Sequence, residues 1–286
     1  MTGMNDPAER APGGEQRQDP RWDVPSWLAE AADLLRFRVL DTKSAQGRIE
    51  TRTKTVTVAD LILFHGHACD GLLRGADAFA ALAATAFPDG VFDWCDLIAV
   101  SKNSPCLGDI VAYLTGGRAR FGTHLLDGSF GVQFVVREIS TGATWELREE
   151  PGFFPPLIVR WDAALLDDAL TDNGTLSPAD KAELVAVNEA VQWNWVRAVL
   201  LPSHPAEHYL VRELRDAQLP VPLADARRTD VVNRDVPPPA RFHSPYEMGF
   251  DAPEPEVPVD LPEPWASRYL DGPPPRPSSP AAPKEP

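Results

Sequence analysis

The sequence predicts an α+β fold, in which helices pack on a mixed or antiparallel sheet over about residues 22–230. One observation is a helical repeat of apolar residues over residues 70–87. Another is a series of β-type segments separated by short turns over residues 123–148. The chain is 43% hydrophobic, enough for an ordinary packed core. Its 286 residues allow one large domain or two small ones, and we expect one.

Both ends of the chain differ in composition from this domain. Residues 1–21 are rich in Gly, Pro, Gln and charge and lack the apolar centre of a signal peptide, so we expect them to be disordered. From Val236 onward, 16 of 51 residues are proline. That density excludes a helix or a sheet, so residues 231–286 are predicted to be an extended, largely disordered tail.

The N-terminal part of the domain is predicted to form a helix and then a strand. Apolar residues recur at helical spacing over residues 26–39, and Ser26 is the expected N-cap. Residues 47–56 alternate and contain several β-branched residues, which is typical of a strand.

Two helices follow, separated by a glycine. Thr57 and Asp60 have the spacing of a capping box and begin a short helix that ends before Gly66. The apolar face of residues 70–87 predicts a long helix, and Pro88 ends it.

The middle of the chain alternates between strand and helix. Residues 97–100 are an apolar run typical of a buried strand, and residues 106–114 are predicted to be a helix. Three β-type segments with turns between them then predict an antiparallel meander, over residues 123–126, 132–139 and 143–148. Ser177 and Pro178 begin another helix that runs to about Leu200, and residues 205–215 are predicted to form a short helix.

The net charge of −15 excludes some functions. Binding to nucleic acid or to an anionic membrane surface requires cationic contacts, so we expect neither. The sequence contains no run of about 18 apolar residues, the length that a helix needs to span a bilayer. The three cysteines lack the spacing of a disulfide framework, so a reducing cytoplasm is the expected location.

Potential metal ligands are concentrated in two glycine-containing loops. His65, His67 and Cys69 alternate in the first loop, and Cys106 lies in the second. Imidazole and thiolate ligands suit zinc and other late divalent metals, so zinc is the first expectation and iron the second. We expect His67, Cys69 and Cys106 to bind the metal, with the fourth position filled by His65, water or a substrate.

Helix starts would favour thiolates at this site. Cys69 and Cys106 each precede or begin a predicted helix, where free N–H groups and the helix dipole stabilise a thiolate. Asp109 shares a helical face with Cys106. It would orient a ligand histidine or move a proton, and it is the candidate catalytic residue.

Other motifs have simpler explanations. Cys95 is expected in or near the core, because single cysteines are usually core residues. Thr115-Gly116-Gly117 resembles a phosphate loop but lacks the Lys-Ser/Thr that follows one, so a helix C-cap is the better interpretation. His204 and His208 are four residues apart, but Pro205 lies between them, so we interpret them as surface residues.

These motifs resemble the FmdE family, named after one of the subunits of formylmethanofuran dehydrogenase. The resemblance covers about residues 57–216 and is carried by ordered motifs: His65-Gly66-His67-Ala68-Cys69-Asp70-Gly71, Cys106-Leu107-Gly108-Asp109, Thr115-Gly116, Phe121-Gly122-Thr123, Asp127 and Thr141-Gly142. It implies an FmdE-like fold and a metal site. It also implies that a cofactor or other ligand is bound by Thr115, Gly116, Gly122 and Thr123.

The chain departs from the family pattern in several places. The proline after the motif cysteine is Asp70, an Asn is replaced by Thr123, and the lysine expected near Val132 is absent. If these positions contact a ligand in the family, the ligand bound here would differ. The four-Cys zinc ribbon of longer family members is also absent.

Two classes of function follow from the resemblance and the metal ligands. One is a metal-binding accessory or carrier component of a redox system, as a homodimer or with another protein as partner. The other is a metal-dependent enzyme acting on a small molecule, with an open coordination position and Asp109 as proton shuttle.

Overall fold

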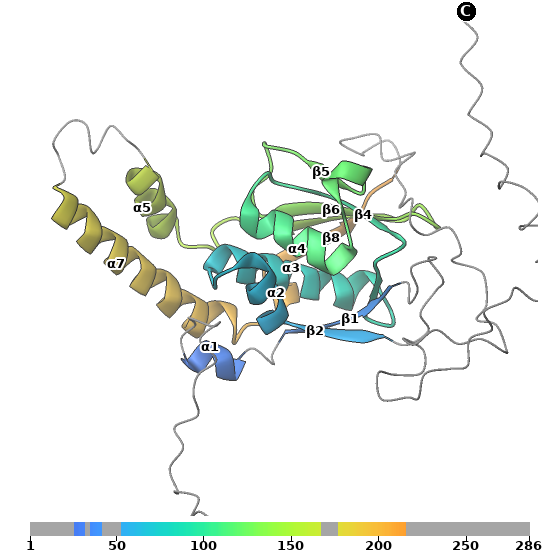
Figure 1. Cartoon of the computed structure of the whole chain (residues 1–286), viewed down its shortest axis with the longest axis horizontal. Helices are drawn as coiled ribbons and strands as arrows, with labels where there is room; N and C mark the ends of the chain where they lie inside the picture. Colours follow the sequence, from blue (N-terminus) through green and yellow to red (C-terminus); the bar gives the residue numbers. More distant parts are fainter. Residues whose placement is uncertain (1–25, 32–34, 42–52, 167–176, 216–286) are drawn as a thin grey trace, which may run out of the picture. The chain divides into compact units, whose positions relative to one another are not determined.

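The computed structural model describes residues 26–31, 35–41, 53–166 and 177–215. The predicted disordered segments, residues 1–21 and 231–286, lie outside the described residues. Helices accompany two sheets, which confirms the predicted α+β class (Figure 1). One sheet has the strand order β2-β1-β3 and the other β5-β4-β6-β7-β8.

The three-stranded sheet begins where the sequence predicted a helix. Helix α1 covers only Ser26–Ala31, and β1 (Arg36–Leu40) follows. Phe37 and Val39 are buried while Arg36 and Arg38 are exposed, and this two-residue alternation is that of a strand. The predicted helix over residues 26–39 is therefore wrong in its second half. Strand β1 pairs with β2 (Lys54–Thr57) and with β3 (Val91–Asp93), which was not predicted.

The three helices of the central region confirm their predictions. Helix α2 covers Val58–His65, with a capping box between Thr57 and Asp60. Helix α3 covers Asp70–Ala86, and most of its residues are buried. Helix α4 covers Pro105–Thr115 and ends at Gly116 in the left-handed conformation, as predicted.

The five-stranded sheet differs from the predicted meander. Strand β4 (Leu97–Ser101) is fully buried and lies between β5 (His124–Leu126) and β6 (Gln133–Glu138). It pairs with β5 in parallel and with β6 in antiparallel orientation. Only β6 and β7 (Thr144–Glu149) form the predicted hairpin. The apolar β4 takes an interior position, second in the strand order, because a strand buried on both faces must lie inside the sheet.

The C-terminal part contains two corrections. Helix α5 (Pro156–Leu166) was not predicted, although Pro156 stands at a position that proline favours in helices. Residues 205–215 form the 3₁₀ turn η3 (Pro205–Glu207) and the edge strand β8 (Tyr209–Glu213) instead of a helix. The predicted helix from Pro178 is confirmed as α7 (Pro178–Trp195), which continues into the π-helical η2 (Val196–Leu200).

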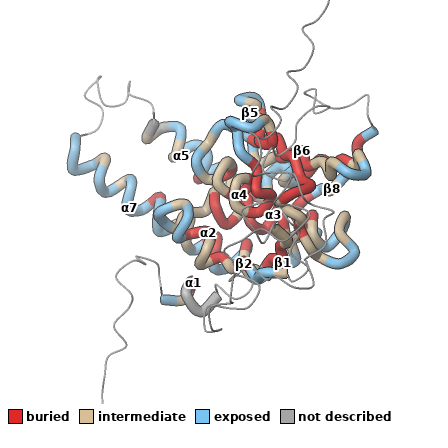
Figure 2. The backbone as a smooth tube through the Cα atoms, turned by 45° about the vertical axis from the view of Figure 1, so that its right-hand side comes forward, coloured by how far each residue is buried: buried red, intermediate tan, exposed pale blue. Residues whose placement is uncertain are grey.

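Helix α3 lies between the two sheets. Its Phe79 ring contacts Phe92 of β3 and Phe134 of β6, with ring centroids 5.8 and 5.1 Å apart. Figure 2 shows the buried backbone concentrated around α3, α4 and the strands beside them. Burial of this helix therefore fixes its N-terminus, where one loop with metal-ligand residues ends. Among the described residues, no helix is both long enough and apolar enough to cross a membrane.

Candidate metal centre

The first candidate metal ligand stands at the end of α2. The Thr57 side chain accepts from the Asp60 N–H, and this cap fixes where the helix begins. Gly66 adopts a φ of 97°, and its N–H donates to the Ile62 carbonyl. Only glycine takes this conformation readily, so the helix ends here. His65 is consequently the last residue of α2.

The two cysteines come from the starts of two other helices. Cys69 is the N-cap of α3, where its sulfur accepts from the Leu72 N–H. Cys106 lies in the first turn of α4, whose N-cap is Ser104. A Cβ added to Gly71 would lie 3.2 Å from the Cys106 Sγ, so glycine allows α3 to approach α4 at this point. Helices α2, α3 and α4 thus converge at the three residues.

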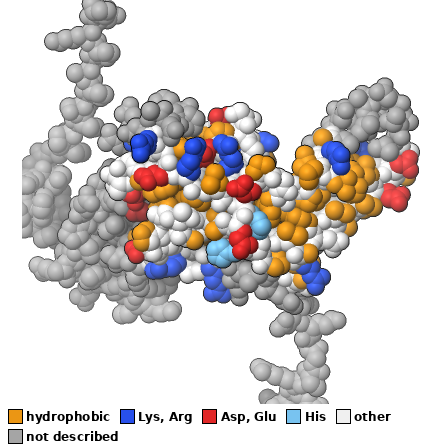
Figure 3. Space-filling view, turned by 180° about the vertical axis from the view of Figure 1, so that it is seen from behind, with side chains coloured by type: hydrophobic (Ala, Val, Ile, Leu, Met, Phe, Trp, Pro, Cys, Tyr) orange, Lys and Arg blue, Asp and Glu red, His pale blue; other side chains and the backbone are white. Residues whose placement is uncertain are grey.

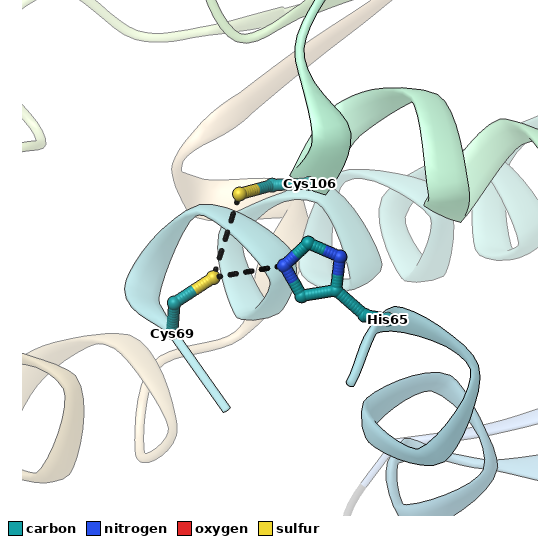
Figure 4. A group of neighbouring side chains, drawn as sticks. All are labelled: His65, Cys69 and Cys106. Carbon is teal, nitrogen blue, oxygen red and sulfur yellow. Dashed lines mark hydrogen bonds between the residues drawn. The ribbon is translucent and has the colours of Figure 1, made fainter. Parts of the chain in front are cut away.

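Figure 4 shows His65, Cys69 and Cys106 pointing toward one another. The Cys69 Sγ lies 3.5 Å from the Cys106 Sγ and 3.7 Å from the His65 Nε2. One donor atom from each of the three residues falls within 4.8 Å of the other two. This is the arrangement of three ligands around a single ion.

A carboxylate fixes the orientation of the imidazole. The His65 Nδ1 lies 2.8 Å from the Asp109 Oδ2, and the His65 side chain is only 2% exposed. With Nδ1 donating to the carboxylate, the Nε2 lone pair is directed toward the cysteines. Asp109 itself is 34% exposed, so it also reaches solvent.

The two thiols interact electrostatically. The hydrogen bond from Cys69 lowers the pKa of Cys106 to about 6, and the nearby His65 contributes. The same hydrogen bond, together with burial, raises the pKa of Cys69. One thiolate therefore forms readily near neutral pH, and a cation would favour ionisation of the second.

Several predicted site residues lie outside the three-residue group. The exposed His67 packs its ring on His65, with centroids 4.4 Å apart, but is not one of the three. The Thr115 hydroxyl donates to the Val111 carbonyl, and the Thr123 hydroxyl accepts from the Arg118 N–H. Gly116 ends helix α4 and Gly122 ends the 3₁₀ turn η1 (Ala119–Phe121), each in the left-handed conformation. The four predicted cofactor-binding residues thus have backbone contacts or turn conformations of their own.

A buried histidine beside the site was missed from the sequence. The His124 Nε2 lies 2.9 Å from the Ser101 Oγ, and the side chains come from the adjacent strands β5 and β4. Burial lowers the pKa of His124, and the charge of Asp109 opposes this effect. Neither residue belongs to a motif, so only the strand pairing brings them together.

An ion-pair network next to Cys69 was also missed. Arg74 donates to both carboxylate oxygens of Glu149, at 2.8 and 2.6 Å, and to the Asp70 Oδ2 at 3.3 Å. Asp70 and Arg74 are separated by one turn of α3, a spacing visible in the sequence. Glu149 is 75 residues away from Arg74 and offers no such local signal.

Comparisons with known proteins identify one family. Residues 64–160 match the family model FmdE, described as molybdenum formylmethanofuran dehydrogenase operon. This match lies within the part of the chain whose motifs resemble the family, and it confirms that resemblance. No curated protein matches the chain.

One solved structure is also similar to the chain. It is the crystal structure of a tungsten formylmethanofuran dehydrogenase subunit (FmdE)-like protein from Syntrophus aciditrophicus. The two chains are 15% identical, and the match covers 61% of this chain and 79% of the other with a TM-score of 0.36.

Proposed function

We propose that this protein is a metal-binding accessory or carrier component of a redox system, because residues 64–160 match the FmdE family model. The metal would be held by His65, Cys69 and Cys106, with zinc ahead of iron. Two thiolates and an imidazole are a ligand set that zinc commonly takes.

The spacing of the donor atoms carries this proposal. With metal–sulfur bonds of about 2.3 Å at tetrahedral angles, two sulfurs on one zinc lie about 3.8 Å apart. A sulfur and an imidazole nitrogen lie about 3.6 Å apart by the same geometry. The observed distances are 3.5 Å between the sulfurs and 3.7 Å from the Cys69 Sγ to the His65 Nε2. Two of the three donor–donor distances therefore match a tetrahedral ion, and the third pair of donor atoms lies within 4.8 Å.

The metal would supply charge neutralisation and Lewis acidity at this point, and the chain's own residues would set its surroundings. Asp109 holds the His65 ring in place, and Gly71 lets the two thiols meet. A carrier or accessory role also requires a surface that binds a protein.

The helical pair α5 and α7 offers such a surface. The Asp162 side chain of α5 accepts from Asn188 and Gln192 of α7, at 2.6 and 2.9 Å, which ties the helices together. Large apolar side chains are nevertheless exposed on this pair and in the adjoining η2: Leu157, Val159, Val185, Val187 and Val199. Figure 3 shows hydrophobic side chains gathered over the helical part at the right of the view. Exposed apolar groups of this kind mark interaction sites.

The occupant we propose is a second copy of this chain. Helix α7 combines its exposed valines with the acidic side chains of Asp180, Glu183 and Glu189. Elsewhere on the surface, the exposed side chains of Phe64 at the end of α2 and Phe121 of η1 are accompanied by the exposed Arg118 and Arg120. The acidic apolar helix of one copy is thus complementary to the basic apolar surface of another, and a reciprocal contact closes a dimer.

Light scattering on the full chain tests this contact. We expect a dimer for the unmodified protein and monomers for Val187→Glu and Arg120→Glu, with Asp89→Lys, at an exposed position in the turn after α3, as a control that stays dimeric. A monomer at every concentration would reject the second copy as occupant and leave a different protein as the partner.

The alternative function is a metal-dependent enzyme acting on a small molecule. Three protein ligands leave a fourth position, and the partly exposed Asp109 lies beside the ligand His65. In that role Asp109 would move a proton between a substrate and solvent. X-ray absorption of the metal-loaded protein separates the two roles. A shell of four protein-derived N and S donors supports the carrier, whereas an exchangeable oxygen donor supports the enzyme.

A further inference from the structure

A potential small-molecule site is lined in part by Arg74 and Glu149, two members of the ion-pair network next to Cys69. A cavity of about 480 Å³ opens where β6 begins and β7 ends, beneath the loop that leads into α5. Its volume falls within the range of small-molecule sites, about 300–1,000 Å³. None of the three candidate metal ligands lines it. The cavity is therefore separate from the candidate metal centre.

One side of the cavity is apolar and held rigidly. Val132, Phe154 and Val159 contribute their side chains to the lining. The Phe154 ring is 8% exposed and packs edge-on against Trp195, with centroids 5.1 Å apart. The Arg74 guanidinium carbon lies 3.7 Å from the centre of the same ring. The Phe154 ring is thus held in place with its face covered by Arg74, and Val132 and Val159 present most of the accessible apolar surface.

The cations around the cavity are already paired. Arg74 is shared between Glu149 and Asp70, so this group of three carries a net negative charge. Arg148 donates to the Glu146 carboxylate at 2.7 Å. The lining thus offers no guanidinium whose charge is uncompensated, and an anionic ligand would have to compete with carboxylates already bound.

The uncompensated charge at the cavity is a carboxylate. Glu150 lines it, is exposed, and has no side-chain partner among the described residues. Its main-chain N–H donates to the His208 carbonyl at 2.8 Å, so its backbone is fixed although its carboxylate is free. A carboxylate beside an apolar wall is complementary to an ammonium group carried on an apolar body.

We propose that this cavity binds a small organic amine, with its ammonium group at Glu150 and its aromatic or aliphatic body against Phe154, Val132 and Val159. The proposal is independent of the metal, because the cavity is built by different residues. Small carboxylates and phosphates of the same size are disfavoured, because the two arginines of the lining are already paired with carboxylates.

The test uses 2-phenylethylamine as probe and 3-phenylpropionate as its anionic counterpart of similar size. Binding to the full chain is measured by ligand-observed NMR and calorimetry, both with zinc and after chelation. We expect saturable binding of the amine in both states and none of the acid. Binding of the acid at equal or higher affinity, or of neither compound, would overturn the proposal.

Variants locate the binding within the molecule. Glu150→Gln should weaken the amine about 3- to 10-fold, since one charge-assisted hydrogen bond is lost at an exposed position. Val132→Trp should fill the cavity and abolish binding. Asp89→Asn changes an exposed carboxylate in the turn after α3 and should have no effect. Because Glu150 is exposed, its substitution should leave folding intact, so an unchanged affinity in Glu150→Gln would refute the assigned position.

Discussion

The Nδ1 atom of His65 and the Oδ2 atom of Asp109 lie 2.8 Å apart, although the residues are 44 positions apart in the chain. His65 ends α2 and Asp109 lies in α4, so the contact joins two helices. The carboxylate leaves the Nε2 atom of His65 free to face Cys69 and Cys106. The orientation of the candidate ligand thus depends on a residue that does not itself belong to the ligand group.

Asp109→Asn should weaken metal binding while leaving the ligands in place. Loss of a carboxylate that orients a ligand histidine typically costs about 10–100-fold in affinity. Competition with a chromophoric chelator measures the change, and Asp89→Asn, at an exposed position, is the control. Equal affinities in the two variants would show that Asp109 does not position His65.

Cys69 and Cys106 should behave as one unit. Each Ser substitution should remove most of the metal and the stability that its binding contributes. That contribution is about 4 kcal/mol when free metal is about 1,000 times Kd. The double variant should be little worse than either single one, because the same ion cannot be lost twice. Metal analysis and thermal unfolding measure both effects.

Cys95→Ser serves as the control for that pair. Cys95 is buried at 8% exposure and stands outside the three-residue group. We expect the Cys95→Ser variant to keep its metal. Tight binding by Cys106→Ser would contradict a site made from two loops.

His65 and His67 should differ in their importance for metal binding. His65 is buried and faces the thiols, whereas His67 is exposed and only stacks on the His65 ring. We therefore expect His65→Ala to lose most of its metal and His67→Ala to retain it, as judged by elemental analysis after gel filtration. The reverse result would restore His67 as a ligand, the role that the sequence spacing suggested.

Asp77 should make stability depend on pH. It is 3% exposed, its Oδ2 has no hydrogen-bond partner among the described residues, and burial raises its pKa to about 7 from the ordinary 3.8. The folded protein therefore holds a proton that the unfolded chain releases above about pH 4. The stability associated with neutral Asp77 is complete below that pH and is lost as pH rises through about 7.

Asp77→Asn should remove this loss. Its melting temperature relative to the unmodified protein should be higher at pH 8 than at pH 5, since the amide stays neutral throughout. Glu183→Gln, at an exposed position of α7, should show no such difference. A pH-independent effect of Asp77→Asn would mean that the carboxyl group is not protonated in the folded state.

Local sequence determined the pieces of the candidate metal centre. The capping box at Thr57, the left-handed Gly66 and the long apolar face of α3 are set within a few residues, and the helices begin and end where these features predict. Cys69 and Cys106 were recognisable as a pair for the same reason, because each lies at a helix start that its neighbours define. The family motifs depend on the same local spacing.

Only the tertiary structure decided which of these residues meet. Residues 36–40 became a strand because Phe37 and Val39 are buried with their sheet, which outweighed the helical spacing of the segment. Strand β4 separated two segments that the turns had suggested would pair. The grouping of His65 with the two cysteines, the Asp109 contact and the Arg74–Glu149 pair all arise where elements distant in sequence pack together. Such contacts depend on the burial of whole elements, and no local spacing encodes them.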